Sequence, residues 1–120
     1  MPRHGHAKAD ARNLYLHRLA LAKLERHPAL IGRVLASIDR WLGENERHPA
    51  RTELLQWRTM LESWPLDRVA KCVLHEEDGQ TLRQCSPLAG VLAPQERWEA
   101  LRRVRSMLDA NSGPNRTATE

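Results

Sequence analysis

Apolar side chains recur along most of this chain at the spacing of one helix face. The clearest example lies between Pro28 and Gly43, where apolar residues stand at i, i+3, i+4, i+7, i+10 and i+11. This spacing places them on one side of an α-helix. β-Branched residues are sparse and never alternate with polar ones over the length of a strand. The pattern therefore predicts an all-α protein, a compact bundle of five or six short helices with an ordered Ser-Pro…Gly loop before the last helix.

Prolines and glycines set the boundaries of the predicted helices, because proline is tolerated in the first turn of a helix but not in its interior. We expect helices over approximately residues 11–27, 28–43, 49–64, 65–75, 78–85 and 94–110. Thr52 is an alternative start for the third. Asp10 is expected to cap the first helix, and Gly43 to end the second in the left-handed conformation. Residues 10–110 would then form a single helical domain, with the second and third helices at its centre.

The two ends of the chain lack an apolar helical pattern. Residues 1–9 are small and polar, and residues 111–120 contain Gly and Pro but no apolar residue larger than Ala. Segments of this composition bury too little apolar surface to become ordered on their own. We therefore expect a flexible N-terminal arm over 1–9 and a disordered tail over 111–120. Chelation of a metal by His4, His6 and the terminal amine is an alternative for the arm.

The segment 83–98 is the one sizeable apolar stretch without a helical pattern. Pro87 disfavours helical geometry at the residue before it, so the preceding helix is expected to end near Cys85. Gly90 suits a turn, and Pro94 suits the first position of the last helix. The apolar residues of the loop indicate that it packs against the core rather than lying in solvent. Two interpretations remain open: a structural clasp between two helices, and a loop that binds a partner.

Positive charge is concentrated near the N-terminus. The chain has 19 Lys and Arg against 15 Asp and Glu, a net charge of +4. The first and last helices each carry basic residues along much of one face, which could neutralise phosphates of nucleic acid. A solvated basic surface is the competing interpretation. The candidate DNA-contacting residues are Arg12, Arg18, Lys23, Arg102 and Arg103.

His17 lies within the apolar stripe of the first predicted helix. A histidine in such a position can serve as a catalytic base or a metal ligand. A buried ring that bonds a carbonyl or a carboxylate is the competing interpretation. No Ser, Cys or paired carboxylate is placed by the sequence to work with His17.

The sequence shows no motif of a known catalytic or metal centre. A Gly-rich phosphate loop and a nucleophile elbow are both missing, and the two cysteines, Cys72 and Cys85, do not have zinc-ligand spacing. We therefore expect a protein that is not an enzyme, with no catalytic residue, no metal and no cofactor. With neither a signal peptide nor an apolar run long enough to cross a bilayer, we expect a cytoplasmic protein with reduced thiols and no membrane contact.

Three fragments of the chain together resemble a group of small bacterial proteins. They are Leu16-His17-Arg18, then Trp57, then Arg83 to Leu92 followed by Glu96-Arg97-Trp98. The group carries an Arg-Gln-x-Ser-Pro-Phe-Ala-Gly-Val-Leu segment before Glu-Arg-Trp, and the resemblance spans roughly residues 14–105. This chain departs from the group in having Leu88 where Phe is usual and Cys85 in place of Ser.

Proteins of this group look like the antitoxins of bacterial toxin–antitoxin pairs. The resemblance implies a non-catalytic protein that binds and neutralises a toxin-like enzyme encoded by an adjacent gene. The expected partner-binding residues are His17, Arg18, Arg83, Ser86, Pro87, Leu88, Gly90, Arg97 and Arg102. Many antitoxins also bind their own promoter, so a small DNA-binding transcriptional regulator is the alternative function. Self-association into a homo-oligomer is compatible with both functions.

Overall fold

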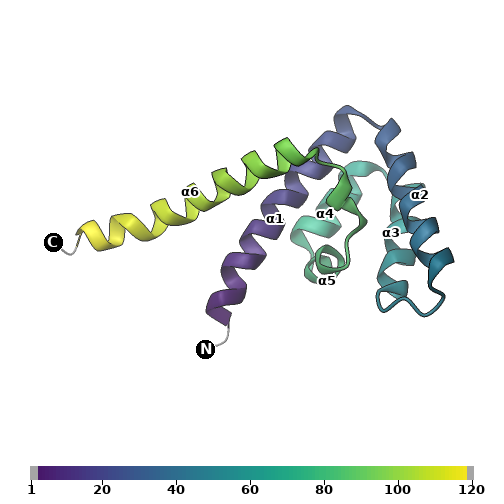
Figure 1. The fold of residues 1–120 in the computed structure, drawn as a ribbon, viewed down its shortest axis with the longest axis horizontal. Helices are drawn as coiled ribbons and strands as arrows, with labels where there is room; N and C mark the ends of the chain where they lie inside the picture. Colours follow the sequence, from purple (N-terminus) through teal and green to yellow (C-terminus); the bar gives the residue numbers. More distant parts are fainter. Residues whose placement is uncertain (1–2, 119–120) are drawn as a thin grey trace.

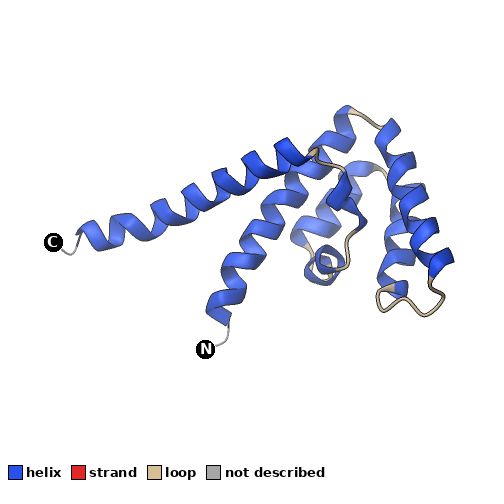
Figure 2. Ribbon diagram, in the orientation of Figure 1, coloured by secondary structure: helices blue, strands red, loops and turns tan. Residues whose placement is uncertain are grey.

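The fold is entirely helical over the part of the chain that the structure describes. The computed structural model describes the backbone of residues 3–118 and the side chains of residues 8–110. Within these limits there are six α-helices, one 3₁₀ turn and no strand (Figure 2). The elements are α1 (Arg3–Arg26), α2 (Ala29–Glu44), α3 (Arg51–Ser63), α4 (Leu66–His75), α5 (Gly79–Gln84), η1 (Pro87–Gly90) and α6 (Pro94–Ala118). The predicted all-α bundle of five or six helices is confirmed.

Helix α1 is the centre of the arrangement. It contacts α2, α4, α5, α6 and η1, whereas α2 and α3 form an antiparallel pair at one end of the molecule (Figure 1). Helix α6 crosses α1 near its own start, and the two helices then diverge toward the chain termini. The expectation that the second and third helices form the centre was wrong. An apolar stripe shows which face of a helix is buried but does not show how many neighbours cover it.

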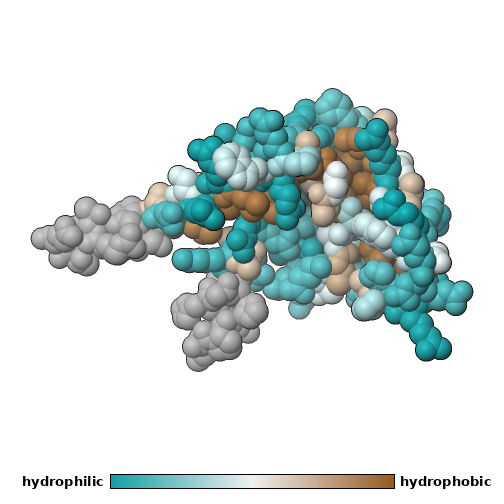
Figure 3. Space-filling model, viewed as in Figure 1, coloured by the Kyte–Doolittle hydropathy of each residue, from teal (hydrophilic) through white to brown (hydrophobic). Residues whose placement is uncertain are grey.

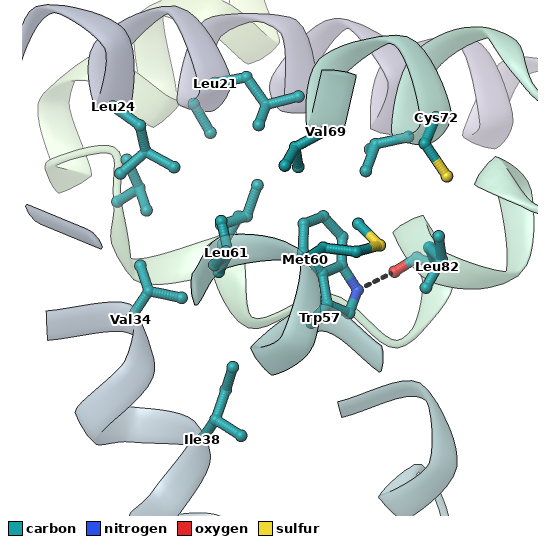
Figure 4. Packing of buried hydrophobic residues seen from close by; sticks show 14 of the residues in the cluster. Leu21, Leu24, Val34, Ile38, Trp57, Met60, Leu61, Val69, Cys72 and Leu82 are labelled. Carbon is teal, nitrogen blue, oxygen red and sulfur yellow. Dashed lines mark hydrogen bonds between the residues drawn. The ribbon is translucent and has the colours of Figure 1, made fainter. Parts of the chain in front are cut away.

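The hydrophobic core joins α1, α2, α3 and α4 and is closed by α5 and the segment after it. Its largest fully buried side chain is Trp57 of α3. The indole Nε1 of Trp57 donates a hydrogen bond of 2.9 Å to the carbonyl oxygen of Leu82 in α5 (Figure 4). A buried indole N–H needs such a partner, so this bond fixes α5 against α3. The other fully buried large side chains are Leu24, Ile38, Met60, Val69, Val73 and Leu82.

The terminal helices are longer than the apolar pattern predicts. Helix α1 begins at Arg3 rather than near Ala11, so Asp10 lies inside the helix and does not cap it. Helix α6 continues to Ala118. The side chains of 1–7 and 111–120, including His4 and His6, lie outside the described residues. The flexibility expected for the two ends and the chelation by His4 and His6 stay predictions.

Gly43 does not have the left-handed conformation expected for it, whereas Gly90 does lie in a turn. Gly43 lies within α2, which ends at Glu44, and Gly90 lies within η1. No described glycine has a positive φ angle. The glycine that the fold does require is Gly79, where a Cβ atom would lie 2.5 Å from the carbonyl oxygen of Val73. Residue 79 must therefore lack a side chain for α5 to approach the end of α4 this closely.

The segment 86–93 is ordered by hydrogen bonds at both of its ends. The Oγ of Ser86 accepts a 3.0 Å hydrogen bond from the backbone N–H of Leu88 and so caps η1. The carboxylate of Glu96 accepts one of 2.7 Å from the N–H of Ala93, at the start of α6. Leu88, Val91 and Leu92 are buried, so the expected packing of this segment against the core is confirmed.

Candidate functional site

The segment 86–93 separates two hollows in the surface. One, named here the His17 hollow, lies between this segment, α1 and α5, and has a volume of about 410 Å³. The other, named the α2 hollow, lies between the segment and α2, and has a volume of about 450 Å³. The His17 hollow is lined by Asn13, Leu16, His17, Ala20, Arg83, Gln84, Ser86, Leu88, Ala89, Leu92 and Arg97. The α2 hollow is lined by Lys23, Leu30, Arg33, Val34, Ser37, Arg40, Trp41, Pro87, Gly90, Val91 and Ala93.

Consecutive residues of the segment line different hollows. Ser86 and Leu88 line the His17 hollow, whereas Pro87 and Gly90 line the α2 hollow. The 3₁₀ turn causes this division, because a turn of about three residues rotates neighbouring side chains to different sides. The segment is therefore a thin wall that both hollows share.

His17 is held in one orientation at the His17 hollow. Its Nδ1 lies 2.8 Å from the carbonyl oxygen of Asn13, one helical turn earlier. Because a carbonyl only accepts hydrogen bonds, Nδ1 carries the proton and Nε2 of the neutral ring is an acceptor. The imidazole also stacks on the ring of Trp57, with 6.4 Å between the centroids. One face of the imidazole is therefore packed against Trp57, and Nε2 is the ring nitrogen that can still form a hydrogen bond.

The Nε2 atom of His17 is buried and has no hydrogen-bond partner in the structure. His17 as a whole is only 7 % exposed. Burial is the main cause that lowers the pKa of His17 below its ordinary value, and the positive charge of Arg83 lowers it further. The ring is therefore neutral near pH 7, and its buried Nε2 is an acceptor without a donor.

Two arginines give the His17 hollow a positive charge. Arg83 is half-buried and donates a 2.6 Å hydrogen bond from Nη1 to the carbonyl oxygen of Val73, near the end of α4. A guanidinium has five N–H donors, so most of those of Arg83 remain available. Arg97, from the first turn of α6, is exposed at the same hollow. No carboxylate is among the residues that line it, so the hollow favours anions.

The α2 hollow combines an apolar floor with a basic rim. Leu30, Val34 and Trp41 of α2 face Pro87 and Val91 across it. In the view of Figure 3, hydrophobic surface gathers between α2 and the start of α6, with hydrophilic side chains around it. The rim is formed by Lys23, Arg33 and Arg40, and no acidic residue lines the hollow.

The rim cations of the α2 hollow are not equally available. Lys23 forms an ion pair with Glu96, at 2.5 Å. This pair lowers the pKa of Glu96 below its ordinary value, with a contribution from the N–H of Ala93. Arg33 and Arg40 are exposed and form no ion pair within the described residues. They are therefore the cations most available to a partner.

The predicted partner-binding residues do not all lie together. His17, Arg83, Ser86, Leu88 and Arg97 meet at the His17 hollow. The remaining members of the set lie elsewhere: Pro87 and Gly90 at the α2 hollow, Arg18 in a separate depression beside α4, and Arg102 with its guanidinium 4.8 Å from the ring centre of Trp98. Trp98 itself is 59 % exposed, so it stands on the surface of α6.

The predicted DNA-contacting residues do not line a common hollow. Arg12 lies in the groove between the diverging parts of α1 and α6, and Arg103 in a separate depression between α1 and the first part of α6. Arg18 faces α4, Lys23 is paired with Glu96, and Arg102 is stacked on Trp98. A continuous track for phosphates would need these side chains side by side.

Sequence reasoning did not single out Arg33 and Arg40. They are seven residues apart, on one side of the apolar stripe of α2. That spacing was visible in the sequence, since positions i and i+7 lie on the same face of a helix. The sequence does not show that η1 packs beside α2 and creates the hollow that these two arginines border.

The described part of the chain contains no obvious metal centre or membrane span. No group of three His, Cys, Asp or Glu side chains lies together in it. Cys72 and Cys85 are both free thiols, and burial raises the pKa of each above its ordinary value. None of the described helices is both long enough and apolar enough to cross a bilayer.

Comparison with known proteins does not assign the chain to a family. No protein-family model, no curated protein and no solved structure matches it. Its function must therefore be argued from the two hollows and the residues that line them.

Proposed function

We propose that this chain is a non-catalytic interaction protein that binds a partner protein at the α2 hollow, and that it acts as the antitoxin of a bacterial toxin–antitoxin pair. The observation that carries the proposal is the α2 hollow itself, an apolar depression whose rim holds cations and no acid. The similarity of the segment 83–98 to antitoxin-like proteins supports the choice of partner, a toxin-like enzyme encoded by an adjacent gene. Binding to that enzyme would neutralise it.

The chemistry of the α2 hollow defines what the partner must present. Apolar side chains would fill the floor formed by Leu30, Val34 and Trp41, where burial supplies most of the binding energy. Carboxylates beside them would meet Arg33 and Arg40, which favours correct encounter and orientation. The partner segment is therefore expected to be apolar and acidic. A large aromatic such as Trp41 and arginines at the rim are also the residue types that dominate binding energy in protein interfaces.

Co-expression with the product of the adjacent gene tests this proposal. The chain should co-purify with that protein and restore growth to cells that express it. In the double variant Arg33→Glu with Arg40→Glu, like charges would oppose the acidic partner. We expect the affinity to fall at least about tenfold, which corresponds to 1.4 kcal/mol.

A matched control separates this effect from a change of net charge. Arg47→Glu with Arg51→Glu makes the same change at exposed positions that do not line the α2 hollow. This variant should bind as the unmodified chain does. Equal affinities of the two double variants, or a failure of the unmodified chain to associate and to restore growth, would contradict the proposal.

DNA binding is the second candidate function, and one observation favours it. Helix α6 exposes Arg97, Arg102, Arg103 and Arg105 along its described length. An electrophoretic mobility shift with the promoter of the chain's own gene, at low salt, tests this candidate because phosphate contacts strengthen as salt falls. A shift that disappears in Arg102→Gln with Arg103→Gln would support it. The absence of any shift at low salt would remove it.

A further inference from the structure

We propose that the His17 hollow binds a phosphate monoester group, with Arg83 and Arg97 contacting its charged oxygens and Nε2 of His17 accepting a hydrogen bond from its P–O–H group. This site lies on the opposite side of the 86–93 wall from the α2 hollow, so the proposal does not depend on the identity of the partner protein.

The first step in the inference is the charge of the hollow. Arg83 and Arg97 come from different helices and line the same space, which no carboxylate lines. Arginine recognises oxyanions through two parallel N–H donors, and the geometry suits both carboxylates and phosphates. Ser86 adds a hydroxyl whose oxygen already accepts the bond from Leu88, so its proton remains free to be donated. These three side chains all offer donors, which suits an anion with several acceptor oxygens.

The second step is the unused acceptor. Nε2 of His17 is buried, has no partner, and belongs to a ring that Asn13 holds in the Nδ1–H form. A ligand that satisfies it must bring a donor as well as a negative charge. A singly charged phosphate monoester has both, because it carries a P–O–H group beside two oxygens that share its charge. Sulfate, carboxylate and phosphodiester groups carry no such proton near pH 7, so Nε2 selects against them.

The third step is the room available. The volume of about 410 Å³ falls within the usual range of small-molecule sites, about 300–1,000 Å³. Leu16, Ala20 and Leu88 supply apolar walls on which an attached organic group could pack. In the structure Nε2 has almost no surface open to solvent, so a ligand reaches it only after the side chains around His17 shift. A small phosphorylated compound therefore fits the hollow in size, polarity and charge.

Calorimetric titration of the full chain with matched probes tests the proposal. Inorganic phosphate and phenyl phosphate carry the required group, whereas sulfate and dimethyl phosphate do not. At pH 6.5 and constant ionic strength, we expect phosphate and phenyl phosphate to bind at least about tenfold more tightly than sulfate or dimethyl phosphate. A phosphoserine tripeptide distinguishes a phosphorylated side chain from a free ester as the source of the group.

Proton linkage gives a readout that a purely structural role would not change. The second ionisation of a phosphate monoester lies near pH 6. Binding of phenyl phosphate should therefore weaken as the pH rises from 6 to 8, with uptake of one proton, whereas sulfate binding should not depend on pH in this way. The proton taken up is shared between the phosphate oxygen and Nε2 of His17.

Three variants complete the test. Arg97→Gln should weaken phosphate binding at least about tenfold, and Arg102→Gln, at another exposed arginine of the same helix, should not. His17→Leu removes the acceptor and should abolish the preference for phosphate over sulfate, with circular dichroism as the check on folding. Equal affinity for phosphate and sulfate, equal effects of Arg97→Gln and Arg102→Gln, or no saturable binding up to 10 mM phosphate would each overturn the proposal.

Discussion

At the scale of single residues, Gly79 and His17 have the least freedom to change. Gly79 is the first residue of α5, and the backbone carbonyls of Val73 and Cys72 occupy the space where its Cβ would lie. Neither carbonyl belongs to a flexible side chain that could move away. His17 is confined by Asn13 on one side and by Trp57 on the other. Gly79 is therefore constrained by contact with backbone atoms, and His17 by its hydrogen bond to Asn13 and its contact with Trp57.

Replacement of Gly79 by alanine should destabilise the fold. The new methyl group would lie 2.5 Å from the carbonyl oxygen of Val73, so α5 would have to shift away from α4. We expect a loss of about 1–3 kcal/mol in the free energy of unfolding, measured by urea denaturation. Gly43→Ala is the control, because a Cβ at Gly43 meets no atom within 4 Å. Since Gly43 lies inside a helix, its replacement should be neutral or stabilising by up to about 1 kcal/mol. Equal losses in the two variants would contradict the role of Gly79.

The neutral state of His17 makes the stability of the fold depend on pH. Burial lowers its pKa in the folded chain, so the unfolded chain binds the proton more readily. The stability that depends on neutral His17 is fully present above the pKa of histidine in the unfolded chain, about 6.5. It is lost as the pH falls toward the lower pKa of His17 in the folded chain. Thermal unfolding between pH 8 and pH 5 should show this loss, and His17→Gln should reduce its slope. An unchanged slope in His17→Gln would refute this account.

At the scale of elements, the short helix α5 is positioned by side chains from its neighbours. Trp57 of α3 donates to the carbonyl of Leu82, and Arg83 donates to the carbonyl of Val73 in α4. A helix of six residues is too short to be stable alone in water, so these contacts hold it in place. Since α5 supplies Arg83 and Gln84 to the His17 hollow, the contacts also shape that hollow.

The indole hydrogen bond of Trp57 can be tested by a conservative change. Trp57→Phe keeps an aromatic ring but leaves the buried carbonyl of Leu82 without its donor and creates a small cavity. We expect a loss of about 2–4 kcal/mol in the free energy of unfolding. Trp98→Phe makes the same substitution at a side chain that is 59 % exposed, and its effect should stay within about 0.5 kcal/mol. If the two variants lose similar stability, Trp57 does not hold α5 in the way described.

The helices could largely be predicted from local sequence signals, whereas their assembly could not. Proline positions gave the starts of α4 and α6 to within a residue, because proline acts on its immediate neighbours. The early start of α1 was missed because residues 3–9 show no apolar periodicity. Gly43 was assigned a left-handed conformation on residue type alone, and the crowding at Gly79 depends on how α4 and α5 meet in space.

The candidate site was predictable in its residues but not in its geometry. His17, Arg83 and Arg97 were singled out, and they do line one hollow. The shared wall could not be foreseen, because it follows from the 3₁₀ turn and from the position of η1 between α1 and α2. Arg33 and Arg40 were overlooked for the same reason.

At the scale of the whole molecule, α6 differs from the other helices because it packs mainly on a single neighbour. It packs mainly on α1 and projects away from the other helices, and the molecule including α6 is 57 Å along its longest axis (Figure 1). Its buried side chains within the described residues are Ala100 and Val104. The orientation of the projecting helix therefore depends mainly on its contact with α1.

Weakening that contact should loosen α6 more than the rest of the molecule. Val104 is 5 % exposed, and Val104→Ala should cost about 1–3 kcal/mol. Amide hydrogen exchange should show a loss of protection in α6 that exceeds the loss in α2 and α3, because openings of low free energy follow local packing. Met107→Ala, at an exposed position of the same helix, is the control and should change neither quantity. A uniform loss of protection across all helices would show that α6 does not open on its own.

The thin wall between the two hollows has a thermodynamic consequence. A ligand in one hollow that shifts residues 86–93 also changes the shape of the other hollow, because neighbouring residues of this segment line different hollows. Any such cross-talk is reciprocal: the factor by which one guest strengthens or weakens the second equals the factor by which the second acts on the first. The affinity for the protein partner and the affinity for the small phosphorylated ligand would then change by the same factor. Titration with either ligand, in the presence and absence of the other, should give that factor.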